Sequence, residues 1–262
     1  MKTLFLTNEY PPTIYGGAGV HVEYLSRELA RLMQVEVCCY GKEHREPRID
    51  TPTLQATGYG FDASGYTAPK NLHSVFGAIQ RGLDWNTTRI EADIVHLHTW
   101  YTHLAGITAK LNYGLPMVLT VHSIEPLRPW KREQLGGGYD FSCWVEKTAI
   151  EMADAVIAVS RETKADIVRL FEVDEARVHI IYNGIDLAEY KPVTTTTSST
   201  PFAASVSSWR SSNDRPANSI RHLGRSWVSC PRRDPWPAER MMAFMESSLA
   251  RQLRQTFGKP SW

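Results

Sequence analysis

The stretch Ala155-Val156-Ile157-Ala158-Val159-Ser160 runs directly into the helical pattern of Arg161–Phe171. Its first five residues are all apolar, which is typical of a parallel strand covered on both faces, because neither face then needs polar side chains. Ser160 stands where the helix would begin, and its hydroxyl can accept a hydrogen bond from a free N–H group of the first turn. The stretch therefore predicts a strand, a cap and a helix in succession.

The same succession repeats along the first 193 residues. Apolar runs of similar length occur at Thr3–Thr7, Val35–Cys39, Asp93–Leu97, Met117–Val121 and Val178–Ile181. Between them lie segments with apolar residues at helical spacing, namely Val22, Leu25, Leu29 and Leu32, and then Phe141, Val145, Thr148 and Met152. Strands that alternate with helices predict an α/β fold, a Rossmann-like doubly wound parallel sheet over residues 1–193.

Composition and charge exclude several classes of protein. The formal net charge of +1 favours neither nucleic acid nor a membrane surface as a partner. Four cysteines without a CxxC pair favour neither a disulfide framework nor a zinc ribbon, and we expect Cys38 and Cys39 to be buried thiols in a strand. Asn8-Glu9 interrupts the apolar start too early for a signal peptide, and no run reaches the ~18–20 apolar residues of a membrane span. We therefore expect a cytoplasmic location.

The chain changes character after Lys191-Pro192-Val193. Residues 1–193 carry 19 basic and 24 acidic residues, a net charge of −5, whereas residues 194–262 carry 10 and 4, a net charge of +6. The later part is dominated by Ser, Arg, Pro and Trp, with one modest helical pattern at 237–255, so we expect an irregular tail with little stable structure. A GC-rich gene read out of frame yields such a composition. A frameshifted or degenerate gene is the preferred hypothesis, and a genuine basic tail is the alternative.

Chemically useful residues follow nearly every predicted strand. In an open parallel sheet, ligands bind beyond the carboxyl ends of the strands. The residues found there are Glu9, Gly16–Gly19, His98, His122, Ser160 and Asn183. Glycines that open a helix let a phosphate approach free backbone N–H groups, although a plain glycine turn or simple capping residues would explain each position separately.

The histidines raise the question of a metal. His96 and His98 are two residues apart, so they share one face of a strand, and His103 or His122 could supply a third ligand. Single histidines at strand ends usually satisfy local hydrogen bonds, and no HExxH helix accompanies them. We therefore predict no metal site.

Five segments together resemble a known family. They are Gly16-Gly17-Ala18-Gly19-Val20-His21, His96-Leu97-His98-Thr99-Trp100, Thr120-Val121-His122-Ser123, Ala155–Ser160 and Tyr182-Asn183-Gly184-Ile185-Asp186, in this order. The set resembles the N-terminal half of retaining glycosyltransferases with two Rossmann domains (the GT-B fold, families 4 and 5), a group that includes glycogen and starch synthases. Glu125-Pro126-Leu127-Arg128-Pro129-Trp130-Lys131, followed by Gly136-Gly137-Gly138-Tyr139, is similar to the actinobacterial glycogen synthase or maltose-1-phosphate synthase branch.

This resemblance implies an activity and a set of roles. The reaction would transfer glucose, with retention, from ADP-glucose or a related nucleotide sugar to an α-glucan or glucose-1-phosphate, without a further cofactor. His122 would be the catalytic residue at the donor sugar. The donor would be bound by Gly16, Gly17, Gly19, Ser160 and Asn183, and the acceptor by Glu9, His98, Trp100 and Tyr101. Thr99 departs from the Asp that many glycogen synthases have there, which makes the acceptor contacts less certain.

The second domain of this family is not recognisable after residue 193. It would supply an Arg/Lys pair for the diphosphate, but Gly224-Arg225-Ser226-Trp227 has no following Lys. It would also supply a Glu-x7-Glu loop, but Glu239 and Glu246 are one residue too close. We therefore expect a truncated enzyme that is weakly active or inactive. The alternatives are a non-catalytic sugar- or glucan-binding remnant and, less favoured, a metal-dependent hydrolase.

Deleting residues 194–262 is expected to leave the thermal unfolding transition of the first domain nearly unchanged. Ordering a chain costs roughly 1–2 kcal/mol per residue in backbone entropy, and this stretch has too little apolar periodicity to offset that cost. Scanning calorimetry of the full and shortened chains measures the effect. A large fall in transition temperature would contradict the expectation. A +1 or −1 reading of the gene that restores no Gly-Arg…Lys-Gly segment would count against the frameshift hypothesis.

Overall fold

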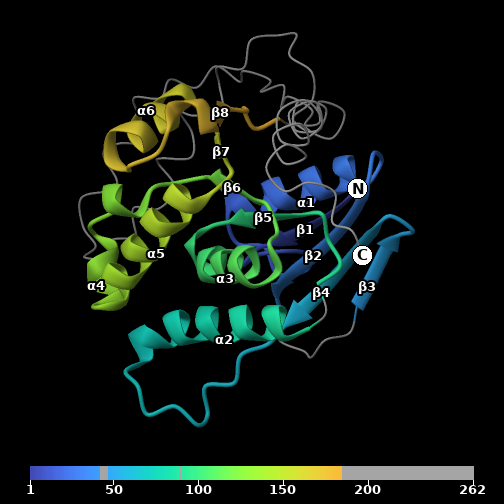
Figure 1. The fold of residues 1–262 in the computed structure, drawn as a ribbon. Coiled ribbons are helices and arrows are strands. Elements are labelled where there is room, and N and C mark those ends of the chain that lie inside the picture. Colours follow the sequence, from blue (N-terminus) through green and yellow to red (C-terminus); the bar gives the residue numbers. More distant parts are fainter. Residues whose placement is uncertain (42–46, 89, 185–262) are drawn as a thin grey trace, which may run out of the picture. The chain divides into compact units, whose positions relative to one another are not determined.

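In a computed structural model, residues 1–41, 47–88 and 90–184 are described, and they contain a single sheet (Figure 1). The strand order is β3-β4-β2-β1-β5-β6-β7-β8. The strands are β1 (Lys2–Leu6), β2 (Gln34–Tyr40), β3 (Pro47–Thr51), β4 (Leu54–Tyr59), β5 (Ile94–His98), β6 (Met117–Val121), β7 (Ala155–Ala158) and β8 (Val178–Ile180). Neighbouring strands are parallel except β3 and β4, which pair antiparallel.

Helices return the chain between the parallel strands. The α-helices are α1 (Gly17–Leu29), α2 (His73–Thr87), α3 (His103–Tyr113), α4 (Lys131–Leu135), α5 (Gly138–Met152) and α6 (Arg161–Leu170). Short 3-10 helices are η1 (Lys70–Leu72), η2 (Trp100–Thr102), η3 (Glu125–Leu127) and η4 (Glu175–Arg177). No helix within the described ranges is long and apolar enough to cross a membrane.

The sheet has a hydrophobic core on each face. Leu4 and Leu6 belong to one core cluster, with residues of α2, α3 and α5, whereas Phe5 between them belongs to the other, with residues of α1. This division follows from the alternation of side chains along a strand. Burial on both faces explains why the strands read as uninterrupted apolar runs.

The predicted α/β class and parallel sheet are confirmed. All six predicted apolar runs are strands, Ser160 Oγ accepts from the backbone N–H of Thr163 at 3.0 Å as the cap of α6, and Cys38 and Cys39 are buried in β2. Leu32 differs from the prediction, because α1 ends at Leu29 and Leu32 lies in the turn toward β2 with 50% of its surface exposed. The predicted irregular tail, 194–262, lies outside the described residues.

Helix α3 packs very closely on β5. A Cβ atom added at Gly106 would lie 2.2 Å from Cδ1 of Leu97, far inside van der Waals contact, and Leu97 is fully buried. Any larger residue at this position must displace the buried Leu97 side chain or move α3 away from the strand that carries His98. Gly106 thus fixes the distance between helix and sheet beneath the candidate site.

Gly106→Ala is therefore expected to lower the free energy of unfolding by about 1–3 kcal/mol, the usual cost of overpacking a core. Urea denaturation measures the change. Gly65→Ala is the matched control, since a Cβ there meets nothing within 4 Å, and its effect should stay within about 0.5 kcal/mol. Equal stability of the two variants would contradict this account of the packing.

Candidate active site

The carboxyl ends of five parallel strands meet at one edge of the sheet. Strands β1, β5, β6, β7 and β8 are successive neighbours, and their registers pair Leu6 with Leu97 and His98 with Thr120. The residues predicted for the site follow these strands: Glu9 and Gly16–Gly19 after β1, His98 at the end of β5, Trp100 and Tyr101 beyond it, His122 after β6, Ser160 after β7 and Asn183 after β8. The fold therefore brings all of them to the same edge.

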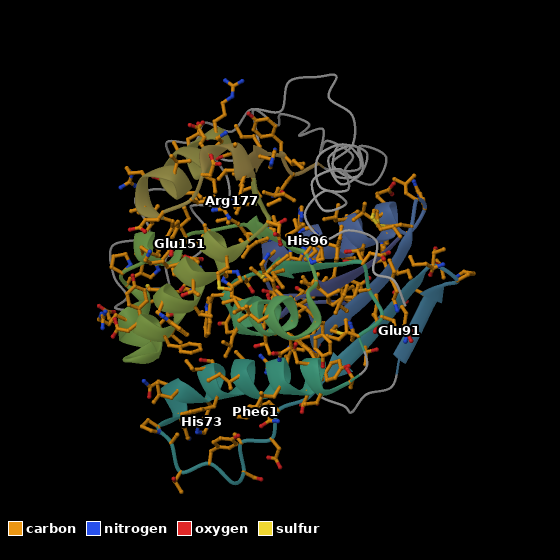
Figure 2. All side chains as sticks on the ribbon, in the orientation of Figure 1. Phe61, His73, Glu91, His96, Glu151 and Arg177 are labelled. Carbon is orange, nitrogen blue, oxygen red and sulfur yellow. The ribbon has the colours of Figure 1, made fainter. Side chains whose placement is uncertain are left out.

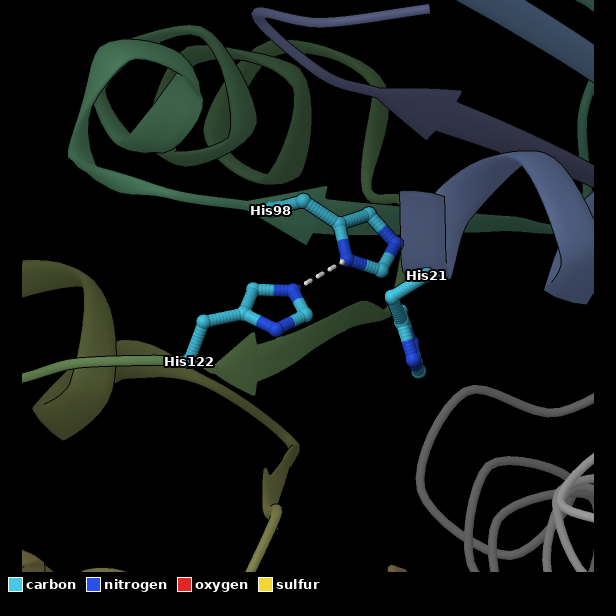
Figure 3. A group of neighbouring side chains, drawn as sticks. All are labelled: His21, His98 and His122. Carbon is cyan, nitrogen blue, oxygen red and sulfur yellow. Dashed lines mark hydrogen bonds between the residues drawn. The ribbon is translucent and has the colours of Figure 1, made fainter. Parts of the chain in front are cut away.

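Two histidines form the centre of this edge. His98 Nδ1 and His122 Nε2 are 3.1 Å apart and share a hydrogen bond (Figure 3). Burial lowers the pKa of both imidazoles well below the usual value, and the neighbouring histidines lower them further. Both rings are therefore neutral at neutral pH, so each has one N–H donor and one nitrogen acceptor to offer.

His21 joins this pair from the first helix. Its ring centroid lies 4.9 Å from that of His122 and 5.7 Å from that of His98 (Figure 3). Burial lowers the pKa of His21 to about 4, and the neighbouring Asn183 side chain opposes that shift. His21 was absent from the predicted site. The feature of the sequence that could have revealed it is its position four residues after Gly17, which places it one turn beyond the start of the helix.

Several buried polar atoms at this edge lack a hydrogen-bond partner. They include His21 Nε2, His98 Nε2 and Asn183 Oδ1. Buried polar atoms are nearly always satisfied in folded proteins, so a group of exceptions needs an explanation. Their position at the ligand-binding edge of the sheet is the explanation we favour, because a bound polar ligand would supply the missing partners.

The histidines that lie together are not the ones that the sequence suggested as metal ligands, which were His96 and His98 with His103 or His122. Among the described residues, the group whose ligand atoms all lie within 4.8 Å of one another is His21, His98 and His122. His96 lies inside the fold (Figure 2). Its ring is tilted by 32° against that of His98, with centroids 4.4 Å apart, and its Nε2 shares a 2.8 Å hydrogen bond with Thr120 Oγ1. His103 is buried on α3.

The glycine loop is held in place by a buried carboxylate. Glu9 Oε2 accepts from the backbone N–H groups of Tyr15 at 3.1 Å and Gly16 at 2.7 Å. A Cβ at Gly19 would lie 2.7 Å from Glu9 Cβ, so the contact with Glu9 requires glycine there. A Cβ at Gly17 would meet nothing within 4 Å. Packing therefore does not explain why residue 17 is a glycine.

The first turn of α1 has no capping side chain of its own, although the Glu9 carboxylate lies next to it, on the N–H of Gly16. The N-cap residue Gly16 has no side chain to satisfy the first-turn N–H groups, and no acidic residue lies in that turn. Free N–H groups and the helix dipole favour negative charge at such a position. By contrast, the Ser160 hydroxyl at the start of α6 is already engaged as a cap.

An aromatic pair follows β5. The rings of Trp100 and Tyr101 stack with centroids 4.0 Å apart, and Trp100 is buried with no partner for its Nε1. Thr99 before them has φ of 67° and ψ of 156°, a conformation that a β-branched residue rarely adopts. Backbone strain of this kind persists where the surroundings enforce it, and it is concentrated at functional sites.

Comparison with known proteins identifies the family. Glycosyltransferase family 4 matches residues 15–189, a range that contains the glycine loop and all three histidines. The chain belongs to this family. The described residues form one Rossmann-like half of a GT-B fold, as the sequence predicted.

The named relatives are glycosyltransferases. Alpha-maltose-1-phosphate synthase of Mycolicibacterium smegmatis is 45% identical over 193 residues, which cover 73% of this chain and 46% of that protein. Glycogen synthase of Mycobacterium tuberculosis is 28% identical over 208 residues, covering 72% and 50%. Sucrose-phosphate synthase of Thermosynechococcus elongatus shares the fold, with a TM-score of 0.54 and 16% identity over 74% of this chain and 51% of that one. The chain spans about half the length of these relatives.

Acidification is expected to destabilise the protein through its buried histidines. The pKa of His21 is about 4 when folded and near 6.5 when unfolded, so between these values the unfolded chain binds more protons. The stabilising effect of keeping His21 neutral is thus present above about pH 6.5 and is lost as the pH falls toward 4. Urea denaturation at several pH values should show His21→Gln with a shallower pH dependence. Val20→Ala serves as the control with the wild-type slope; identical slopes in all three proteins would refute the assignment.

Proposed function

We propose that this chain carries the ligand-binding edge of a retaining hexosyltransferase that moves glucose from ADP-glucose to an α-glucan or glucose-1-phosphate. One observation carries the proposal. The uncapped first turn of α1 and the neutral His122 lie near each other, because His21 belongs to the second turn of α1 and its ring is 4.9 Å from that of His122. A diphosphate at the helix start would place its sugar beside His122.

The chemistry of transfer needs both features. Breaking the bond between the sugar and the diphosphate leaves negative charge on the phosphate oxygens, which positioned N–H donors stabilise. Gly17 lets these oxygens approach the backbone. His122 is neutral, so it can hydrogen-bond a sugar hydroxyl near the reacting carbon without adding charge to the site.

The choice of donor and acceptor rests on the relatives. The 45% identical relative is named for the synthesis of maltose-1-phosphate, and a more distant one for glycogen. Glucose-1-phosphate and an α-glucan are the acceptors that correspond to these two names. ADP-glucose is the donor implied by the resemblance of the sequence motifs.

The 262-residue chain is proposed to have no more than trace activity. The diphosphate would meet the glycine loop without the Arg/Lys pair that the family's second domain supplies. Losing one donor of this type costs on the order of 10²–10³ in rate, and several would be absent here. Turnover at an ordinary rate, roughly 1–10³ per second, would contradict this part of the proposal.

Binding of ADP-glucose tests the site independently of turnover. Gly17→Ala is expected to weaken ADP-glucose binding several-fold in titration calorimetry, because the added methyl group keeps the phosphates from the backbone. It should not lower stability, since a Cβ at Gly17 meets no atom within 4 Å. Gly65→Ala, equally open, should bind like the wild type. Maltose binding without any ADP-glucose binding would instead favour the non-catalytic sugar-binding remnant.

A further inference from the structure

Three histidines at the carboxyl edge of the sheet lie close enough together to hold one metal ion. Within the described part of the chain, His21, His98 and His122 form the group in which one ligand atom from each residue lies within 4.8 Å of the others (Figure 3). They come from three different elements, namely α1, the end of β5 and the residue after β6. The proposed transfer reaction uses His122 at the donor sugar and gives His21 no role.

Two of these rings are already separated almost as ligands of one zinc ion would be. Zinc binds imidazole nitrogens at about 2.0–2.1 Å in a tetrahedral arrangement, which places two such nitrogens about 3.4 Å apart. His98 Nδ1 and His122 Nε2 are 3.1 Å apart and share a hydrogen bond. An ion between them would replace the shared proton, because a nitrogen that binds a metal offers its lone pair instead of a hydrogen.

His21 can supply the third ligand. Its Nε2 is a buried atom without a hydrogen-bond partner, so the lone pair or hydrogen on this nitrogen is not engaged by the protein. His98 is fully buried, whereas His21 and His122 are half-buried, so an ion can approach from the side of these two rings. A rotation of the half-buried His21 side chain is enough to bring its nitrogen from the 4.8 Å limit to the separation that zinc requires.

The elements that carry the three rings are held firmly. Strands β5 and β6 pair in parallel, so the ends that carry His98 and His122 lie side by side. The Glu9 carboxylate accepts from the backbone N–H of Gly16 at 2.7 Å, which fixes the start of the helix that carries His21. Ligands on strand ends and on a helix are positioned more precisely than ligands on loops, so little ordering is needed when an ion binds.

The ligand atoms determine the class of metal. The group consists of imidazoles and includes neither a carboxylate nor a thiolate. Imidazole nitrogen suits Zn²⁺ and the neighbouring first-row metals, whereas Mg²⁺ and Ca²⁺ need oxygen ligands. Three histidines also leave the fourth position of a tetrahedral ion to water or another small ligand, as in zinc sites that keep an open position.

The sequence-based prediction of no metal site concerned sets that contained His96 and left out His21. His96 Nε2 shares a 2.8 Å hydrogen bond with Thr120 Oγ1, and the ring is fully buried. The structure thus engages His96 elsewhere and brings the ring of His21 into the group instead. This exchange of one histidine is the reason to depart from the prediction.

We infer that His21, His98 and His122 bind one Zn²⁺ ion, or another divalent first-row transition metal, at the carboxyl edge of the sheet. The binding itself does not depend on the proposed function, but its consequence rests on that function. His122 cannot hydrogen-bond the donor sugar while its nitrogen is on the metal, so Zn²⁺ and ADP-glucose exclude each other. Zinc is therefore an inhibitor of donor binding.

Titration of the full chain with Zn²⁺ alone, after a chelator has removed bound metals, tests the site. One tight equivalent is expected to bind at neutral pH, and Mg²⁺ should not compete with it. His21→Gln and His122→Gln should each weaken Zn²⁺ binding at least about tenfold, since losing even an outer-shell partner of a metal typically costs that much. His73→Gln is the matched control with the wild-type affinity, because His73 lies outside the group, with a ring nitrogen 2.9 Å from the carbonyl oxygen of Ala68.

Cobalt gives a readout that depends on no variant. Co²⁺ bound to the wild-type chain should show the strong visible absorption of a four-coordinate ion, without the near-ultraviolet band of thiolate ligands, and Zn²⁺ should abolish it. The absence of a bound equivalent, the weak spectrum of a six-coordinate ion, or a thiolate band would each overturn the inference. So would an unchanged Zn²⁺ affinity in His21→Gln and His122→Gln proteins that circular dichroism shows to be folded.

ADP-glucose titrations with and without Zn²⁺ separate this inference from the proposed function. Saturating Zn²⁺ is expected to suppress ADP-glucose binding to the wild-type chain. The suppression should be lost in His21→Gln, a comparison that corrects for zinc bound by the nucleotide itself. Equal or tighter ADP-glucose binding in the presence of Zn²⁺ would overturn the mutual exclusion. A chain that binds Zn²⁺ in this way but never binds ADP-glucose would contradict the proposed function and leave the metal site standing.

Discussion

The parallel pairing of β5 with β1 on one side and β6 on the other governs the candidate site. It sets the carboxyl ends of these strands side by side, so residues more than 70 positions apart in the sequence meet there, as Phe5 of β1 and His98 of β5 do. Side chains alternate along β5, and a slip of one residue would replace His98 at the edge by the apolar Leu97. The tight contact between Gly106 and Leu97 helps to fix that register from the helical side.

Burial then sets the chemistry of the edge. The three histidines are neutral because the surroundings disfavour their charged forms, not because a base removes their protons. A neutral imidazole can both donate and accept, which suits recognition of sugar hydroxyls. The same low polarity makes the guanidinium of Arg81 costly to bury, and burial lowers the pKa of this group.

The sequence predicted the part of the fold that is buried on both faces. Apolar runs marked six strands, whereas β3 and β4 were missed. In β4, Gln55 and Thr57 interrupt the apolar residues, and a strand toward the sheet's margin needs fewer of them. Ser160 was predictable as a cap because the signal is local.

The burial of Arg81 was harder to predict. Nothing in the sequence of α2 distinguishes Arg81 from a solvated surface arginine, because its burial depends on Asn8 and Tyr40, which come from other elements. The roles assigned to Glu9, His98, Trp100 and Tyr101 remain predictions. Their positions follow from the fold.

The backbone of Thr99 has an evolutionary consequence. Holding a β-branched residue at φ of 67° and ψ of 156° costs on the order of 1–3 kcal/mol, which a glycine would avoid. If variants of this protein were selected only for thermal stability, replacement of Thr99 would be favoured early, because it removes this conformational cost. A lineage selected for sugar transfer would gain less if the strained turn orients Trp100 and Tyr101. The residue found at this position across descendants would then record which of the two pressures acted on them.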